Sequence, residues 1–434
     1  MTLQTRYLRR FSALAAIILI SLGSNAATSD IQSRYSDEMN ALQANPAVAA
    51  ALAHVIDLEP RSHADLIELT EIPAPPFKEQ RRADRFAELL REAGLTDVTI
   101  DEAGNVIGRR PGRTGDKVIA YSGHLDTVFP EGTDVTVRFD GDRMYAPGIG
   151  DNTRGLVVVL GVLRALQHAD IETDADILFI GNVGEEGLGD LRGIKHLFRD
   201  GASKIDALIA VDGGDTDRIV YGGVGSHRYR VTFKGPGGHS WGAFGTANPH
   251  HALGRAIALF DENAPSVTET GEKTSYNIGR IGGGTSINSV PFESWMEVDM
   301  RSGKQDKLDD IDAVLQASVQ QALQEENEGR SRGDALTVDI ERVGTRPAAM
   351  GDPQSALVQR AMAATKAYDV EPELRISSTD ANLPISIGVP AVTMSRGGRG
   401  GDAHAPDEWW QNDQGYLAMQ IGILTLLATA GLAH

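Results

Sequence analysis

Apolar and polar positions follow two different patterns along the chain. Toward both ends, short continuous apolar runs alternate with helical stretches. This is typical of an α/β domain in which a mostly parallel sheet is flanked by helices. Helices are predicted at 156–167, 191–200, 353–368 and 412–432, and buried strands at 118–121, 175–181, 207–212, 373–376 and 390–394.

The middle of the chain follows the second pattern. Alternation of apolar and polar residues predicts half-exposed strands, and amphipathic spacing predicts two helices between them. The strands lie at 229–233, 274–281, 295–301 and 336–342, and the helices at 249–263 and 304–326. We therefore expect residues 223–344 to form an inserted α+β domain, while residues 27–222 and 345–434 together build the α/β domain.

The first 26 residues are organised differently from the rest. Three arginines within residues 1–10 precede an apolar run at 11–23, and small residues follow at 24–26. This order is that of a secretory signal peptide, and 13 apolar residues are too few to span a bilayer comfortably. We expect cleavage after residue 26, and a periplasmic or secreted protein with no membrane association after cleavage.

The composition narrows the possible chemistry. The chain has 434 residues and no cysteine, which excludes disulfides, iron–sulfur clusters, thiolate zinc sites and cysteine nucleophiles. Its 60 acidic and 41 basic residues give a formal net charge of −19, whereas nucleic-acid binding needs a basic surface. We therefore expect no nucleic-acid partner and a site built from imidazole and carboxylate groups.

Side chains with metal-binding chemistry follow several of the predicted strands. Open α/β sheets place their ligand sites at the carboxyl ends of the strands. Taken singly, each group has a simpler explanation: an Asp before a helix can be an N-cap, paired Glu residues can form a solvated turn, and a lone His is usually exposed. The residues are His124, Asp126, Asp151, Glu185, Glu186, Asp212 and His404.

As a set, these residues predict a site for two divalent metal ions. Two histidines and three carboxylates suit a pair of ions that share one carboxylate and lie about 3.5–4 Å apart. Nitrogen and oxygen ligands without sulfur favour zinc, with manganese or cobalt as alternatives. Of the two remaining carboxylates, Asp126 stands beside His124 and can orient its ring. The other is then free to take a proton from metal-activated water as a general base.

Five segments carry a resemblance to a known family. HLDTVFP, GIGDNTRG, GEEGLGDLRG, VDGGD and AHAPDE occur in the order and with the separations of a metallopeptidase family. From about residue 64 to its end, the chain resembles this family, which includes peptidase T, dipeptidase V, glutamate carboxypeptidase and aminoacylase. The resemblance implies a di-zinc site and gives each residue a role. Asp151 bridges the metals, His124 and Asp212 complete one metal site, Glu186 and His404 complete the other, Glu185 is the general base, and Asp126 orients His124.

The inserted domain resembles the lid, or dimerisation, domain of the same family. The segment GPGGHS matches a loop whose histidine, here His239, often reaches an active site across a dimer and polarises the scissile carbonyl. The resemblance therefore implies a homodimer in which His239 is a catalytic residue and contacts substrate. It also implies substrate contacts by Asn288, Arg301, Gly397 and Gly398.

Some positions depart from the family pattern or match none of it. Asn152 stands where many relatives have a second aspartate or another motif. The fourth metal ligand is Asp212 rather than Glu, which resembles the aminopeptidase and dipeptidase branches of the family. Structural roles are expected for the remaining lid-region histidines, His227, His250 and His251.

These observations predict an exported di-metal exopeptidase that hydrolyses short peptides and is of the aminopeptidase, dipeptidase or tripeptidase type. The alternative is a metallocarboxypeptidase or an N-acyl-amino-acid deacylase, which Arg301 would favour if it grips a free carboxylate. A peptide-binding or scaffold protein on an inactive hydrolase fold is a third hypothesis. Such a protein usually lacks the general base or a metal ligand, whereas the base and all five ligands are present here.

Overall fold

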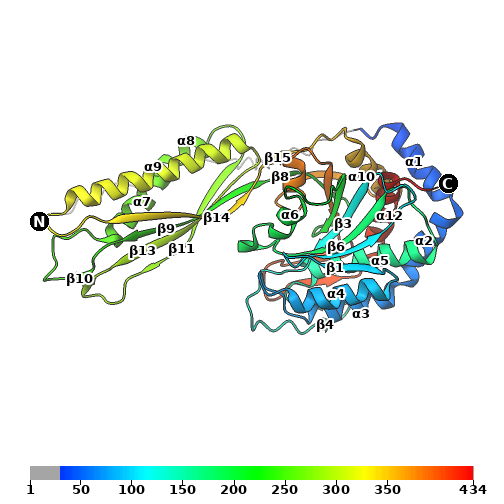
Figure 1. Cartoon of the computed structure of the whole chain (residues 1–434), viewed down its shortest axis with the longest axis horizontal. Coiled ribbons are helices and arrows are strands. Elements are labelled where there is room, and N and C mark those ends of the chain that lie inside the picture. Colours follow the sequence, from blue (N-terminus) through cyan, green and yellow to red (C-terminus); the bar gives the residue numbers. More distant parts are fainter. Residues whose placement is uncertain (1–29, 434) are drawn as a thin grey trace, which may run out of the picture.

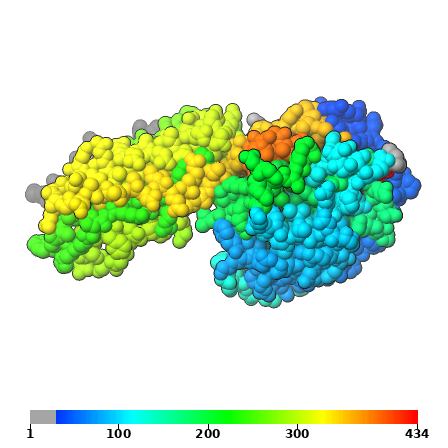
Figure 2. All heavy atoms as spheres, viewed as in Figure 1, coloured from blue at the N-terminus to red at the C-terminus, as the bar shows by residue number. Residues whose placement is uncertain are grey.

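The computed structural model describes residues 30–433, so the predicted signal peptide at 1–26 lies outside the described residues. Two lobes lie one after the other along the long axis of the molecule (Figures 1 and 2). The larger lobe is the α/β domain, and the elongated one is the inserted lid domain. The chain enters the lid domain after β8 (Arg218–Gly223) and returns through β14 (Thr337–Arg346) to β15 (Ala349–Met350).

A nine-stranded sheet forms the centre of the α/β domain. Its order is β1-β2-β6-β3-β7-β17-β8-β15, with β16 paired to β8. The four central strands β6, β3, β7 and β17 are parallel, which confirms the predicted fold class. The strands are β1 (Asp97–Ile100), β2 (Val106–Arg110), β3 (Val118–His124), β6 (Asp176–Asn182), β7 (Ala207–Asp212), β16 (Glu373–Ser377) and β17 (Ala391–Ser395).

Helices cover both faces of this sheet. Successive residues of a strand point to opposite faces, and in the central strands the residues on both faces are apolar. In β3, Ile119 and Tyr121 belong to the main core, which includes α5 and α12. Ala120 faces the opposite core, formed with α6 and α11. The helices of this domain are α1 (Ser33–Ala44), α2 (Pro46–Asp57), α3 (Glu59–Thr70), α4 (Gln80–Glu92), α5 (Arg154–His168), α6 (Arg192–Leu197), α10 (Ala356–Lys366), α11 (Asn382–Ser386) and α12 (Tyr416–Ala430).

The C-terminal helix α12 is apolar on nearly all sides, and its residues are buried in the main core. A helix of this kind packs inside a large domain or crosses a membrane. Within residues 30–433, no helix combines the length and the apolar character needed to span a bilayer. The apolar residues of α12 therefore serve as core packing.

The lid domain has a core of its own. Its antiparallel sheet has the order β11-β13-β9-β14, and α7 and α9 pack on one face of it. Tyr229, Val231 and Phe233 of β9 point alternately into this core, as the predicted alternation requires. The elements are β9 (Gly225–Lys234), α7 (Pro249–Asn263), α8 (Pro265–Thr268), β11 (Thr274–Gly283), β13 (Glu293–Ser302) and α9 (Gln305–Gly329).

A small sheet beside the α/β domain was not predicted. It has the order β18-β19-β5-β4, with β4 (Arg138–Asp140), β5 (Arg143–Tyr145), β18 (Arg399–Gly401) and β19 (Trp409–Gln411). Each strand has three residues, which is too short for a period of two to be visible in the sequence. The sheet matters for the site because it joins the loop after β5 to the loop after β17.

Candidate metal centre and active site

The predicted ligands meet at one edge of the central sheet. His124 is the last residue of β3, Asp212 is the last residue of β7, and Glu185 and Glu186 follow β6. These three strands are adjacent and parallel, so their carboxyl ends face the same way. The strand ends therefore carry the side chains to one place, as an open α/β sheet requires.

The loop that carries Asp151 is held in shape by a buried carboxylate. Glu408 accepts the backbone N–H groups of Gly148, Gly150 and Asp151 at 2.8–2.9 Å. Asn152 follows a cis peptide bond and donates from Nδ2 to the carbonyl of Val211 on β7 at 2.7 Å. The departure from the family pattern at position 152 thus supplies a structural hydrogen bond that fixes the loop to the sheet.

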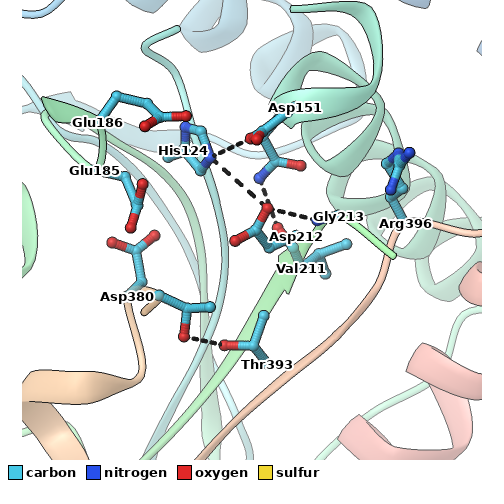
Figure 3. A network of polar contacts seen from close by, with 12 residues as sticks. His124, Asp151, Glu185, Glu186, Val211, Asp212, Gly213, Asp380, Thr393 and Arg396 are labelled. Carbon is cyan, nitrogen blue, oxygen red and sulfur yellow. Dashed lines mark hydrogen bonds and ion pairs between the residues drawn. The ribbon is translucent and has the colours of Figure 1, made fainter. Parts of the chain in front are cut away.

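Asp151 offers one oxygen to each of two histidines. Its Oδ1 lies 3.1 Å from His124 Nε2, and its Oδ2 lies 3.1 Å from His404 Nε2. His404 Nε2 is also 3.0 Å from Glu186 Oε1, and His124 Nε2 is 3.9 Å from Asp212 Oδ1. Figure 3 shows His124, Asp151 and Asp212 pointing toward one another. One carboxylate therefore joins two groups of possible ligands.

These groups fit divalent metal ions. His124, Asp151 and Asp212 place their ligand atoms within 4.8 Å of one another, and so do Asp151, Glu186 and His404. Two tetrahedral ligands about 2.0–2.1 Å from zinc lie about 3.3 Å apart, close to the separations found here. The nitrogen and oxygen donors also match the preference of zinc. The structure thus brings together all five predicted ligands, with Asp151 in both groups.

The charges in the cluster are strongly coupled. Burial alone would raise the pKa of Asp151, but hydrogen bonds from His124 and His404 lower it well below its ordinary range. Hydrogen bonds to Asp151 and Glu186 raise the pKa of His404 to about 10. Burial opposes the charge on His124, yet the nearby carboxylates of Asp126 and Asp151 raise its pKa well above the ordinary value. Without ions, the surrounding carboxylates thus favour the charged form of both histidines.

Asp126 contacts more than the histidine that it was predicted to orient. The Nδ1 atom of His124 lies 3.0 Å from the main-chain oxygen of Asp126 and 3.6 Å from its carboxylate. The carboxylate itself accepts the backbone N–H groups of Glu185 at 3.0 Å and Glu186 at 2.7 Å. Asp126 therefore holds the loop of the predicted base as well as the ring of His124.

Glu185 is buried and is held by an arginine that the sequence analysis did not identify. Arg346, the last residue of β14, donates from Nη1 to Glu185 Oε1 at 2.8 Å and from Nη2 to the Glu185 main-chain oxygen. Burial raises the pKa of Glu185 well above its ordinary value, against the attraction of Arg346, and nearby Glu186 raises it further. Arg346 lies outside every recognised motif, so no local signal pointed to it.

A second buried acid, Asp380, was also missed. It faces Glu185 in Figure 3 and accepts a hydrogen bond from Asn182 Nδ2 at 2.8 Å. Burial raises the pKa of Asp380 to about 7. Its signal was present in the sequence: Asp380 follows the predicted strand at 373–376, and strand ends also supplied His124 and Asp212.

A polar hollow of about 510 Å³ opens over the cluster. Arg301 lines it, and its Nε donates to Asp299 Oδ2 at 2.7 Å. The same aspartate accepts from Arg228 Nε at 2.9 Å, so two guanidinium groups of the lid domain share one carboxylate. Five arginines line the hollow: Arg218, Arg228, Arg301, Arg346 and Arg396.

His239 and Asn288 are not brought to this hollow within one chain. His239 is exposed on β10 (Gly238–His239), which pairs with β12 (Ser289–Val290). Ser240 donates its N–H to the Asn288 carbonyl at 2.9 Å, so both predicted residues belong to the same loop pair. This pair lies at the end of the lid domain farther from the α/β domain (Figure 1).

The predicted substrate contacts of Gly397 and Gly398 are not supported. The N–H group of Gly397 donates to Ser395 Oγ at 2.9 Å and is not available to substrate. Gly398 lines a separate hollow with Asp215 and Gln414. Gly400 and Gly401 line the central hollow instead, because the chain turns away after β17 and returns to the cluster in β18.

The other three histidines of the lid domain have local partners there. His227 Nδ1 lies 2.9 Å from Asp312 Oδ2, and His250 Nδ1 lies 2.7 Å from Ser294 Oγ. His251 Nδ1 lies 3.8 Å from Glu326 Oε1. None of the three belongs to a metal-ligand group of the described residues, in agreement with their expected structural roles.

Known structures share this fold. Aminopeptidase PepT from Bacillus cereus has a TM-score of 0.67, with 21% identity over 86% of this chain and 98% of its own. The di-peptidase Dug1p from Saccharomyces cerevisiae has a TM-score of 0.69, with 16% identity over 89% of this chain and 99% of its own.

Sequence comparison gives the family. Carboxypeptidase G2 from Pseudomonas sp. (strain RS-16) is 24% identical over 252 residues, which cover 55% of this chain and 59% of that protein. The chain thus aligns with less than two thirds of that relative. The family model described as peptidase family M20/M25/M40 matches residues 120–428, which is more than half of the chain. The predicted resemblance is confirmed: this chain belongs to peptidase family M20/M25/M40.

Proposed function

We propose that the protein is a di-metal exopeptidase that hydrolyses short peptides from the amino end. The observation that carries the proposal is the position of Asp151, which offers one carboxylate oxygen to each of two ligand groups. A carboxylate shared between two ions is the arrangement of two-metal hydrolytic sites. The neighbours PepT and Dug1p are described as an aminopeptidase and a di-peptidase, which supports a short-peptide substrate.

The five ligands divide into two sites that share Asp151. His124, Asp151 and Asp212 would hold one ion, and Asp151, Glu186 and His404 would hold the other. Bound divalent ions supply Lewis-acid polarisation of a carbonyl and make a water molecule more acidic. Zinc suits the donor set best, with manganese or cobalt as alternatives.

Glu185 is placed to move the proton. Its Oε1 is held by Arg346 Nη1, and the Glu185 main chain is held by Arg346 Nη2 and by Asp126. A fixed carboxylate with a raised pKa can accept a proton from the attacking water and deliver it to the nitrogen of the leaving amine. The leaving amine therefore lies on the Glu185 side of the site.

Arg301 supports a second candidate function. Its Nε is paired with Asp299, and its remaining N–H groups line the hollow without a partner among residues 30–433. A guanidinium of this kind binds a free carboxylate well. This contact suits the carboxyl end of a dipeptide or tripeptide, but it suits a carboxypeptidase or N-acyl-amino-acid deacylase equally.

We also propose a homodimer in which His239 of one chain serves the site of its partner. His239 lies on the far end of the lid domain, so its own cluster lacks the donor expected to polarise the scissile carbonyl. Export is a further part of the proposal and rests on residues 1–26. Sequencing the amino terminus of the mature protein tests it, and retention of residues 1–26 would contradict it.

A panel of leucyl-leucine derivatives separates the two candidate functions. The metal-loaded enzyme should cleave the free dipeptide and lose activity when the amino end is acetylated. Full activity on the acetylated substrate would instead favour a carboxypeptidase or deacylase. Glu185→Ala should lower the rate by about 10²–10⁴ and retain the metals, whereas Glu341→Ala, which removes an exposed carboxylate of β14, should change neither.

A further inference from the structure

Arg396 is a buried cation that forms no close ion pair within residues 30–433. It follows β17 directly, and only 7% of the residue is exposed. Its Nε is buried without an acceptor, and Nη1 makes one long hydrogen bond of 3.4 Å to the Gly214 carbonyl. Among the described residues, no carboxylate forms an ion pair with it. Burying an unpaired guanidinium lowers the stability of the fold. The position of Arg396 therefore suggests a role other than stabilising the fold.

Three glycines surround the Arg396 guanidinium, and side chains at their positions would crowd it. A Cβ at position 400 would lie 2.1 Å from Nη2, and a Cβ at position 150 would lie 3.1 Å from both Nε and Nη2. A Cβ at position 213 would lie 3.3 Å from Nη1. Because these positions carry no side chains, the guanidinium lies against bare backbone at the wall of the central hollow.

A second arginine reaches the same place. Arg218 Nη1 donates to the Gly213 carbonyl, and the Cβ position of Gly213 lies 4.0 Å from this nitrogen. The other N–H groups of Arg218 have no partner in the described part of the chain, and Arg218 also lines the hollow. Two guanidinium groups therefore converge on one glycine, and both have unused donors.

The nearby carboxylates are engaged elsewhere or exposed. Asp151 and Asp212 belong to the metal-ligand groups. Glu408 accepts three backbone N–H groups of the Asp151 loop, and Asp215 lies at the exposed rim. No ion pair within residues 30–433 joins any of these four carboxylates to Arg218 or Arg396. Ions in the ligand groups would offset the charges of Asp151 and Asp212. The unused donors of the two arginines would then remain available to an anion in the hollow.

The two arginines lie on the acyl side of the site. In Figure 3, Arg396 lies beyond Asp151 and Asp212, on the side opposite Glu185. In the proposed function the leaving amine faces Glu185, so the acyl part of the substrate would extend toward Arg396. We infer that Arg396 and Arg218 form an anion-binding subsite that selects substrates whose acyl part carries a carboxylate. This inference rests on the proposed function and names its substrate class.

The carboxylate has two chemical sources. It can be the side chain of an acidic amino-terminal residue, or the free end of a dicarboxylic acyl group on an amino acid. Glutamyl-leucine against glutaminyl-leucine tests the first source, because the two differ in charge but hardly in shape. Succinyl-leucine against butyryl-leucine tests the second. We expect the metal-loaded wild type to favour the acidic member of at least one pair by about tenfold or more in kcat/KM.

The variants Arg218→Gln and Arg396→Gln should reduce this preference to about unity by lowering only the rate on the acidic substrate. Arg399→Gln is the matched control, because it removes an exposed arginine of the nearby strand β18 that pairs with Asp413 outside the hollow. Arg218→Gln alone carries the test if Arg396→Gln fails to fold, since Arg218 is only half-buried. Equal rates on both members of both pairs, or a loss in the variants that affects all substrates alike, would overturn the inference.

A binding measurement separates this inference from the proposed function. If the metal-loaded wild type cleaves none of these substrates, the proposed function fails, and the subsite is then tested with glutarate by calorimetry. The inference predicts binding to the metal-loaded wild type that is about tenfold weaker in Arg218→Gln and unchanged in Arg399→Gln. No binding to the wild type, or equal binding to all three proteins, would overturn it.

Discussion

The strand-end cluster of the α/β domain and the far end of the lid domain differ in how their chemistry is held. His124 and Asp126 are 1% and 0% exposed, and each is held by a neighbouring strand or loop. His239 is exposed on a strand of two residues. The cluster has its ligands and base in place within one chain, whereas His239 contacts none of them. The proposed homodimer accounts for this difference, because a second chain would complete the site.

The surroundings of His239 support this interpretation. Trp241 is 88% exposed, Phe244 is 83% exposed, and Ile287 is fully exposed. Apolar side chains grouped on a surface in this way mark an interaction site more often than a free surface. Most apolar side chains of the α/β domain are packed into cores around the sheet. Its exposed ones, such as Phe77 at 64% and Phe139 at 63%, are less exposed than Trp241, Phe244 and Ile287.

The largest effect that bears on this comparison is expected from His239→Ala. Loss of a donor to the developing oxyanion should lower kcat by about 10²–10³, while the metals stay bound because His239 is not a ligand. His251→Ala is the matched control, since His251 is an exposed histidine of the same domain. Steady-state kinetics on the leucyl-leucine panel measure both variants.

Mixing His239→Ala with Glu185→Ala sharpens the same comparison. Each variant alone is nearly inactive, but a mixed dimer contains one site with an intact Glu185 and an intact His239 from the partner. If subunits exchange freely, the mixture should recover about a quarter of wild-type activity. Recovery of no activity after shown subunit exchange would mean that His239 does not act across a dimer.

A smaller effect is expected from pH, and it concerns the cluster alone. Hydrogen bonds to Asp151 and Glu186 raise the pKa of His404 to about 10, so the ion-free chain carries this proton at pH 7. Metal ions bind neutral imidazole, so binding must release the proton. The apparent zinc affinity should rise about tenfold per pH unit for each such histidine between pH 6 and 9. Calorimetry in buffers of different ionisation enthalpy measures how many protons are released when zinc binds. Binding without proton release would contradict the assignment of His404 as a metal ligand.

Much of the fold and of the cluster could be predicted because their signals are local. Apolar runs and alternation identified most strands and helices, and the strand ends identified His124, Glu186 and Asp212. The shared role of Asp151 needed the whole ligand set, because a lone aspartate before a helix looks like a cap.

The residues that were missed depend on distant contacts. Arg346 meets Glu185 across 161 positions of sequence, and Glu408 holds the Asp151 loop across 257. Arg396 stands within a glycine-rich segment whose close packing shows only in three dimensions. Position along a strand predicts where a side chain points, but not which remote group it will meet.

The number of metal ions per chain tests the central claim most directly. After dialysis against excess zinc and removal of free ions, the wild type should retain two ions per chain, and elemental analysis measures them. His404→Ala should retain one, because His124, Asp151 and Asp212 form a ligand group without His404. A wild type with no bound ion, or a His404→Ala variant that binds as many ions as the wild type, would contradict a pair of sites joined by Asp151.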